Sequence, residues 1–157
     1  MLEIFIDADG CPVKDEIYRV AERYGLSVTL CANSWMRIPD REWIRLEVVA
    51  DLFDAADDWI AENVGEDDVV VTGDIPLAKR CLDQGAKVIG HRGDEFDPDS
   101  IASALAMREL MSHLRDIGEA GGGPPPFDKR DRSRFLQRLD QVIQEVRRRR
   151  PDDAPTS

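Results

Sequence analysis

The chain has 157 residues, of which 42% are hydrophobic, and its net charge is −11. This length suits one domain with a single hydrophobic core, and no apolar stretch is long enough to cross a membrane. The residues after Met1 lack the basic and apolar leader of a secretory signal. Three widely spaced cysteines fit neither a disulfide framework nor a zinc site. We therefore expect no disulfide and a cytoplasmic location.

The negative charge is distributed unevenly along the chain. Residues 129–150 carry nine basic and three acidic side chains, a local charge of +6, which leaves −17 for the rest. This asymmetry predicts an acidic body with a basic C-terminal segment. An acidic body can still bind phosphate groups if a divalent cation lies between carboxylate and phosphate.

The first predicted element is a buried strand at residues 2–6, four of which are large and apolar. Asp7 and Asp9 follow it directly. Gly10 and Pro12 then end the strand, and Pro12 is expected to be the first residue of a helix. Ligands bind at the carboxyl ends of strands in open α/β sheets, so the two acids are candidates for a functional site. Alternatively, they only satisfy free amides of the first helical turn.

The later elements alternate between helical and strand patterns. Apolar spacing predicts helices at 13–24, 52–64, 77–84, 101–117 and 135–146, and strands at 27–31, 43–49, 67–72 and 86–90. Short connections between them are typical of a Rossmann-like, three-layer α/β sandwich with a parallel sheet. We expect an α/β domain at 1–118. A Gly/Pro loop, a basic helix docked on the body to about residue 147 and a disordered tail should then make up 119–157.

Two further acids are predicted at the same edge of the sheet. Asp74 follows the strand that ends at Thr72, and Pro76 then starts a helix. Asp57 lies beside Ala56 on the core side of the second predicted helix, where a carboxylate needs a partner. The alternative for Asp57 is a favourable interaction of acids with the helix N-terminus.

Asp7, Asp9, Asp57 and Asp74 are therefore predicted to gather in a small space. Four carboxylates cannot all ionise there unless a cation compensates them, because like charges raise each other's pKa. Mg²⁺ or Mn²⁺ prefers such oxygen ligands, contacts phosphate and activates water. The sequence thus predicts a catalytic metal site for phosphodiester hydrolysis.

Five residues are candidates for substrate contact. Asn33 follows the second strand, although turn chemistry explains an asparagine there equally well. Thr72 ends a later strand, and Arg92 lies in the turn after the next one. Arg130 and Arg132 begin the basic C-terminal helix, which is expected to guide an RNA backbone, with a solvated run of charges as the alternative.

Four segments of the chain occur in a specific combination. They are Asp7-Ala8-Asp9-Gly10-Cys11-Pro12-Val13, Phe53-Asp54-Ala55-Ala56-Asp57, Thr72-Gly73-Asp74-Ile75-Pro76-Leu77-Ala78, and Gly122-Gly123-Pro124 with Arg130-Asp131-Arg132 and Phe135. Together they resemble the YaiI/YqxD family of bacterial proteins, over residues 1 to about 145.

The fold of that family looks related to PIN-like (PilT N-terminus) nuclease domains, in which acids at strand and helix ends bind Mg²⁺ or Mn²⁺ for RNA cleavage. The resemblance implies that Asp7, Asp57 and Asp74 take these places, with Asp9 as an added acid. Many PIN-like sites carry another Asp two residues after the last one, where this chain has Pro76. Either Asp9 replaces it or the site holds metal weakly.

Two other functions fit the same residues. Asp7-x-Asp9-Gly10 after a hydrophobic strand is similar to the nucleophile motif of haloacid-dehalogenase-like phosphatases, with Thr72, Lys79 and Asp94 in place of the remaining motifs. That hypothesis leaves Asp57 without a role and leaves no room for a flap before the first helix. The other alternative is a non-catalytic module that binds RNA or a nucleotide and uses the acidic edge only as a cation site. The sequence leaves the oligomeric state open.

Overall fold

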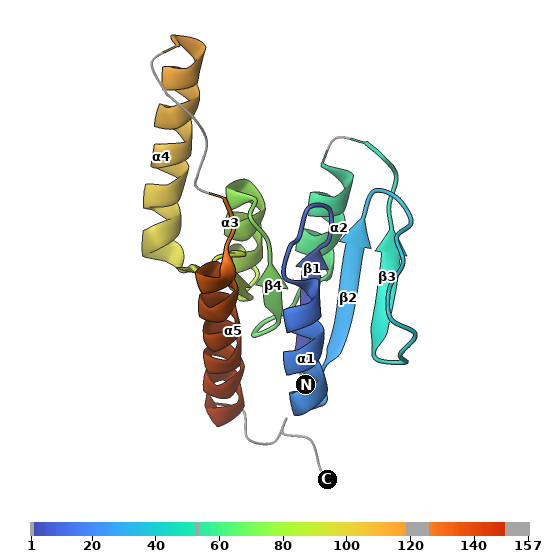
Figure 1. The fold of residues 1–157 in the computed structure, drawn as a ribbon. Coiled ribbons are helices and arrows are strands. Elements are labelled where there is room, and N and C mark those ends of the chain that lie inside the picture. Colours follow the sequence, from blue (N-terminus) through green and yellow to red (C-terminus); the bar gives the residue numbers. More distant parts are fainter. Residues whose placement is uncertain (1, 53, 119–125, 150–157) are drawn as a thin grey trace.

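A computed structural model describes residues 2–52, 54–118 and 126–149 (Figure 1). Its strands are β1 (Glu3–Asp7), β2 (Ser27–Ala32), β3 (Ile44–Val48), β4 (Val69–Val71), β5 (Lys87–Ile89) and β6 (Glu95–Phe96). Its helices are α1 (Lys14–Tyr24), α2 (Ala55–Asn63), α3 (Ile75–Asp83), α4 (Pro98–Asp116) and α5 (Lys129–Arg149). The predicted alternation of strands and helices is confirmed. The predicted loop and tail fall mostly outside the described residues.

The strands form one sheet in the order β3-β2-β1-β4-β5-β6. The first five are parallel, as predicted, and β6 runs antiparallel to β5. The sequence carries no signal for β6, because two residues are too few for alternation. This strand order is that of doubly wound folds. The chain lays β2 and β3 on one side of β1 and β4 and β5 on the other, so the switch point lies between β1 and β4.

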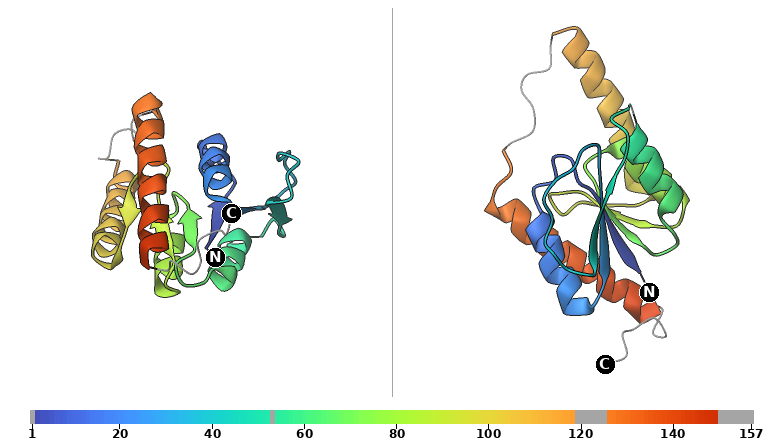
Figure 2. Two further views of the ribbon diagram at one scale, coloured as in Figure 1. Left: turned by 90° about the horizontal axis from the view of Figure 1, so that it is seen from below. Right: turned by 90° about the vertical axis from the view of Figure 1, so that its right-hand side faces the viewer.

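Helices cover both faces of the sheet, which confirms the three-layer sandwich. Figure 2 shows α1 and α5 on one side and α2 on the other. Apolar side chains of α1 and α5, among them Ile17, Phe135 and Ile143, pack with Ile4 and Ile6 of β1. Helices α2 and α3 pack on the opposite face. Because Phe135 and Ile143 are fully buried, α5 belongs to the body, as predicted.

Two helices, α1 and α2, start later than the sequence predicts, whereas α3, α4 and α5 start earlier. Pro12 is not the first residue of a helix, because α1 begins at Lys14 with Val13 as its N-cap. Helix α2 begins at Ala55, three residues later than predicted, because Asp54 adopts a left-handed conformation with φ of 62°. The predicted stop of α1 is confirmed, since Gly25 forms a left-handed C-cap that only a residue without a side chain adopts easily.

Helix α4 has a different environment from the other helices. Its first turn packs on the body through Ile101, whereas Leu110 and Ile117 are about half exposed. Figure 1 shows α4 extending beyond the sheet. Within the described ranges, no helix has the length and apolar character that a membrane crossing requires. The three cysteines are free and buried.

Candidate active site

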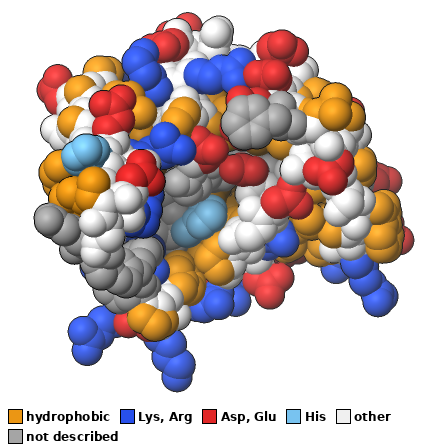
Figure 3. All heavy atoms as spheres, turned by 90° about the horizontal axis from the view of Figure 1, so that it is seen from above, with side chains coloured by type: hydrophobic (Ala, Val, Ile, Leu, Met, Phe, Trp, Pro, Cys, Tyr) orange, Lys and Arg blue, Asp and Glu red, His pale blue; other side chains and the backbone are white. Residues whose placement is uncertain are grey.

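The carboxyl ends of the parallel strands surround a small cavity that we call the acidic cavity. Its volume is about 220 Å³, and its lining consists of Asp7, Asp9, Asn33, Leu52, Asp54, Ala55, Ala56, Asp57 and Asp74. All four acids predicted as metal ligands therefore meet here, together with Asn33. Figure 3 looks onto this edge and shows acidic side chains gathered beside a hollow. The cavity lies at the switch point of the sheet, where doubly wound folds bind ligands.

Thr72 joins the two strand ends that flank the switch point. Its side chain is fully buried, and its hydroxyl donates to Asp7 Oδ2 over 2.8 Å. The same hydroxyl oxygen accepts from the backbone N–H of Asp74 over 3.0 Å. The sequence predicts substrate contact for Thr72, but the structure places its hydroxyl between the Asp7 carboxylate and the backbone N–H of Asp74, outside the lining of the cavity.

Two other acids are oriented by backbone amides. Asp74 caps α3, where its Oδ1 accepts from the N–H of Leu77 over 3.0 Å. Asp9 Oδ2 accepts from the N–H of Asn33 over 3.0 Å. Each of these bonds uses one carboxylate oxygen and leaves the second for a ligand. Among the described residues, the buried Asn33 Oδ1 has no hydrogen-bond partner, so a ligand could supply one.

The carboxylates of the cavity repel one another. Burial raises the pKa of Asp7, and the charges of Asp74 and Asp9 raise it further, against the hydrogen bond from Thr72. Burial and the charges of Asp74, Asp7 and Asp54 raise the pKa of Asp57 to about 6. The cavity therefore holds more negative charge than its neighbourhood compensates, which favours proton or cation binding.

Asp54 is a member of this cluster that the sequence prediction misses. The sequence pattern places it inside a helix, but it is the N-cap of α2 and its side chain caps no amide. Its positive φ is one that Asp and Asn tolerate better than other residues with a side chain. The available signal is an aspartate near the start of a predicted helix, where Asp favours the N-cap, but a left-handed conformation leaves no trace in hydrophobic spacing.

The donor set fits a divalent cation in its chemistry. Five carboxylates supply the oxygen ligands that Mg²⁺ and Mn²⁺ prefer. In the part of the chain that the structure describes, no three potential ligands converge closely enough to form a ready-made metal cage. Mg²⁺ commonly keeps several waters and takes only one or two carboxylates, so a hydrated ion suits an open cavity of this kind.

The predicted arginines lie outside the lining of the acidic cavity. The Nη1 of Arg132 donates to the backbone oxygen of Pro12 over 2.7 Å and to Glu16 Oε1 over 3.1 Å. The guanidinium of Arg92 donates to Asp131 Oδ2 over 2.9 Å. Both guanidinium groups also lie over the ring of Phe127. These contacts attach the start of α5 to the body.

Arg130 is exposed in the first turn of α5. Its backbone N–H donates to Asp128 Oδ1. Of the three predicted arginines, it is the one whose guanidinium forms no ion pair or hydrogen bond with the described residues.

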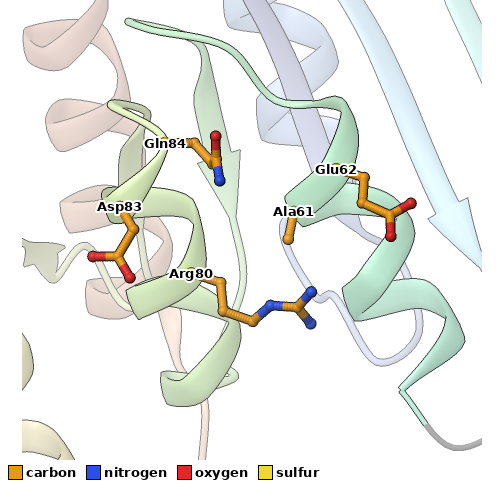
Figure 4. Close-up of a pocket in the computed structure, with 5 residues that line it drawn as sticks. All are labelled: Ala61, Glu62, Arg80, Asp83 and Gln84. Carbon is orange, nitrogen blue, oxygen red and sulfur yellow. The ribbon is translucent and has the colours of Figure 1, made fainter.

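A larger cavity of about 400 Å³ lies between α2 and α3, and none of the predicted residues lines it. Figure 4 shows Arg80 of α3 pointing from its lining toward α2. Arg80 forms an ion pair of 2.7 Å with Asp58, and its charge lowers the pKa of Asp57. Arg80 thus connects this cavity electrostatically with the acidic one.

Comparisons with known proteins identify relatives over almost the whole chain. A UPF0178 protein of Rhodospirillum centenum is 56% identical over 154 residues, which cover 96% of this chain and 100% of the relative. A UPF0178 protein of Parvibaculum lavamentivorans is 54% identical over 151 residues, 96% of this chain and 99% of the relative. No solved structure matches the chain.

The relation to PIN-like domains remains a prediction. The profile described as "Uncharacterized BCR, YaiI/YqxD family" matches residues 5–145. The chain therefore belongs to the YaiI/YqxD family, as its four motifs predict.

Proposed function

We propose that this protein is a divalent-metal-dependent nuclease that hydrolyses phosphodiester bonds of RNA at the acidic cavity. The proposal rests on one observation above all, namely five carboxylates around one cavity at the switch point of a parallel sheet. The raised pKa values of Asp7 and Asp57 support it, because they indicate negative charge that a cation would stabilise.

The residues of the cavity have distinct roles in this proposal. Asp7 and Asp74 hold the cation and are oriented by Thr72 and by the first turn of α3. Asp57 and Asp54 complete the negative field from α2. When bound, Mg²⁺ or Mn²⁺ neutralises the phosphate and supplies an activated water for attack on phosphorus.

The start of α5 supports a polyanionic substrate. Arg132 contacts the backbone of Pro12, three residues beyond Asp9, so the first turn of α5 lies near the loop that carries Asp9. Lys129 and Arg130 are exposed in that turn. Their charges lie where they can attract a phosphate backbone as it approaches the cavity.

A non-catalytic RNA-binding module is the second candidate. The observation that favours it is the lack of a ready-made metal cage among the described residues. The phosphatase hypothesis is less well supported, because it assigns no role to Asp54 or Asp57 in the lining of the cavity.

The deciding experiment is a calorimetric titration with Mn²⁺, combined with a cleavage assay on fluorescent RNA. Asp7→Asn and Asp74→Asn are expected to abolish both metal binding and cleavage while leaving the fold intact. Asparagine can keep the oxygen that accepts from Thr72 and is as good an N-cap as aspartate. Asp83→Asn is the matched control, because Asp83 is an exposed acid outside the acidic cavity.

Unchanged Mn²⁺ affinity in both cavity variants would contradict the proposal. RNA binding without cleavage, if lost on Arg130→Ala, would favour the module. Trapping of beryllofluoride on Asp7 would favour the phosphatase.

A further inference from the structure

Exposed apolar side chains lie beside the acidic cavity, on the side of β2 and β3. Trp35 is 76% exposed and follows β2 by three residues. Leu52 is 69% exposed, follows β3 by four residues and lines the cavity itself. A tryptophan is usually well buried, and exposed apolar surface beside a site is often a binding surface.

The segment that carries Trp35 is anchored rather than loose. Met36 and Ile38 are partly buried and pack against the core of α1, α5 and the sheet. Trp35 and Arg37, which alternate with them, are exposed. Because exposed and partly buried residues alternate from Trp35 to Ile38, the core contacts of Met36 and Ile38 hold the side chains of Trp35 and Arg37 on the outer side.

This face is close to the cavity. Trp35 is two residues beyond Asn33, so their Cα atoms are at most about 7 Å apart. Asn33 lines the cavity and binds Asp9 through its backbone N–H. Within the described residues, Arg37 has no ion pair, so its charge is available to a ligand.

We propose that Trp35, Arg37 and Leu52 form a nucleotide subsite beside the acidic cavity, which we call the Trp35 subsite. An unpaired base stacks on the indole of Trp35, Leu52 bounds the base on the cavity side, and Arg37 contacts a neighbouring phosphate. The inference rests on the proposed function, because the nucleotide in the Trp35 subsite is the neighbour of the one whose phosphate enters the acidic cavity. It adds a requirement for an unpaired base, since a base within a duplex offers no free face for stacking.

Stacking can be separated from charge with two matched RNA probes. One is a short fluorescent oligouridylate, and the other has the same backbone with abasic sugars. Binding is measured by anisotropy in EDTA, so that no cleavage interferes. Trp35→Ala is expected to weaken oligouridylate binding about tenfold, within the range for loss of one base–aromatic stack, and Trp35→Phe to restore most of it. Neither variant should change binding of the abasic probe.

Arg37→Ala should have the complementary effect. It is expected to weaken both probes by the same factor and to reduce the dependence of binding on salt. Tryptophan fluorescence gives an independent readout. The chain contains Trp43 and Trp59 besides Trp35, so each tryptophan is replaced in turn to identify the one whose emission responds to RNA. Oligouridylate should quench the emission of the Trp43→Phe and Trp59→Phe variants but leave that of Trp35→Phe almost unchanged.

Several results would overturn the Trp35 subsite. They are failure of the intact protein to bind oligouridylate, unchanged binding by Trp35→Ala, and an equal loss for the natural and abasic probes. A change of oligomeric state on Trp35→Ala, seen by light scattering, would instead show that the indole contacts a second copy of the chain.

If binding depends on Trp35 but Mn²⁺ supports no cleavage, the subsite stands and the nuclease proposal fails. If RNA is cleaved but neither binding nor cleavage depends on Trp35, the nuclease proposal stands and the subsite fails.

Discussion

The acidic cavity and the Asp131 cluster hold carboxylates at the same edge of the sheet in opposite electrostatic environments. We use the name Asp131 cluster for Asp131 with Arg92, Arg134 and Phe127. Asp131 is 2% exposed and forms ion pairs with both arginines. The backbone N–H of Asp128, followed by these arginines, lowers its pKa. Burial and neighbouring acids raise the pKa of Asp57 instead.

This difference separates two uses of the same residue type. A buried carboxylate with cations and amides around it has its ion-pair and hydrogen-bond partners within the folded chain, and its removal should lower stability. A carboxylate surrounded by other acids lacks a compensating charge. Its removal should weaken ligand binding and relieve electrostatic repulsion. The following predictions test this distinction, from the largest expected effect on stability to the smallest.

Asp131→Ala is expected to be the most destabilising of these changes. It removes the Asp131 carboxylate that accepts from two guanidinium groups and from the N–H of Asp128, and it weakens the attachment of α5. Urea unfolding should show a clearly lower midpoint with an unchanged slope. Asp83→Ala is the matched control, because Asp83 is also paired with a cation on its own helix but is exposed. A similar midpoint for both variants would contradict a structural role for Asp131.

Thr72→Val should affect both stability and metal binding. It removes the hydroxyl that donates to Asp7 and accepts from the N–H of Asp74, so an expected cost of about 1–3 kcal/mol follows from the lost buried hydrogen bonds. The pKa of Asp7 should rise further, because the hydroxyl lowers it in the intact protein. Mn²⁺ affinity should therefore fall in calorimetry. Thr72→Ser keeps the hydroxyl and should bind Mn²⁺ almost normally, and an equal loss in both variants would argue against this role.

The sequence predicts the parts of the site that follow from regular structure. Asp7 comes directly after a buried apolar run and Asp74 three residues after another, and parallel strands bring such ends to one edge. Asp57 is predicted because helical spacing places it beside Ala56 on the buried side. These positions depend only on element type and order, which the spacing of apolar residues encodes.

The parts that the sequence does not predict depend on individual contacts. Hydrophobic spacing gives no indication that Arg92 and Arg132 lie over Phe127, or that their acidic partners are Asp131 and Glu16. A basic helix start suggests phosphate binding whether its cations are paired or free. The distribution of charges along the chain therefore identifies the basic segment but does not separate Arg132, which holds α5, from the exposed Arg130.

The smallest change in stability is expected for Asp57→Asn. Unlike the other two substitutions, it should make the protein more stable. The Asp57 carboxyl has an ordinary pKa of 3.8 and a folded pKa of about 6. Between these pH values the folded state binds more protons than the unfolded state, so stability falls as the pH rises through this window. Asparagine removes that dependence. Because Asp57 is only half-buried, Asp57→Asn should be more stable than the parent by about 1 kcal/mol above pH 6 and equal to it below pH 4.

Urea midpoints measured across this pH window test the expectation. Asp58→Asn is the matched control on the same helical turn, since it removes the ion pair with Arg80 rather than a repulsion and should not stabilise the protein. Mn²⁺ should reduce the advantage of Asp57→Asn, because a bound cation stabilises the charge that the variant lacks. A stability difference that is the same at every pH would show that Asp57 is not repelled by its neighbours, and the contrast with Asp131 would then be lost.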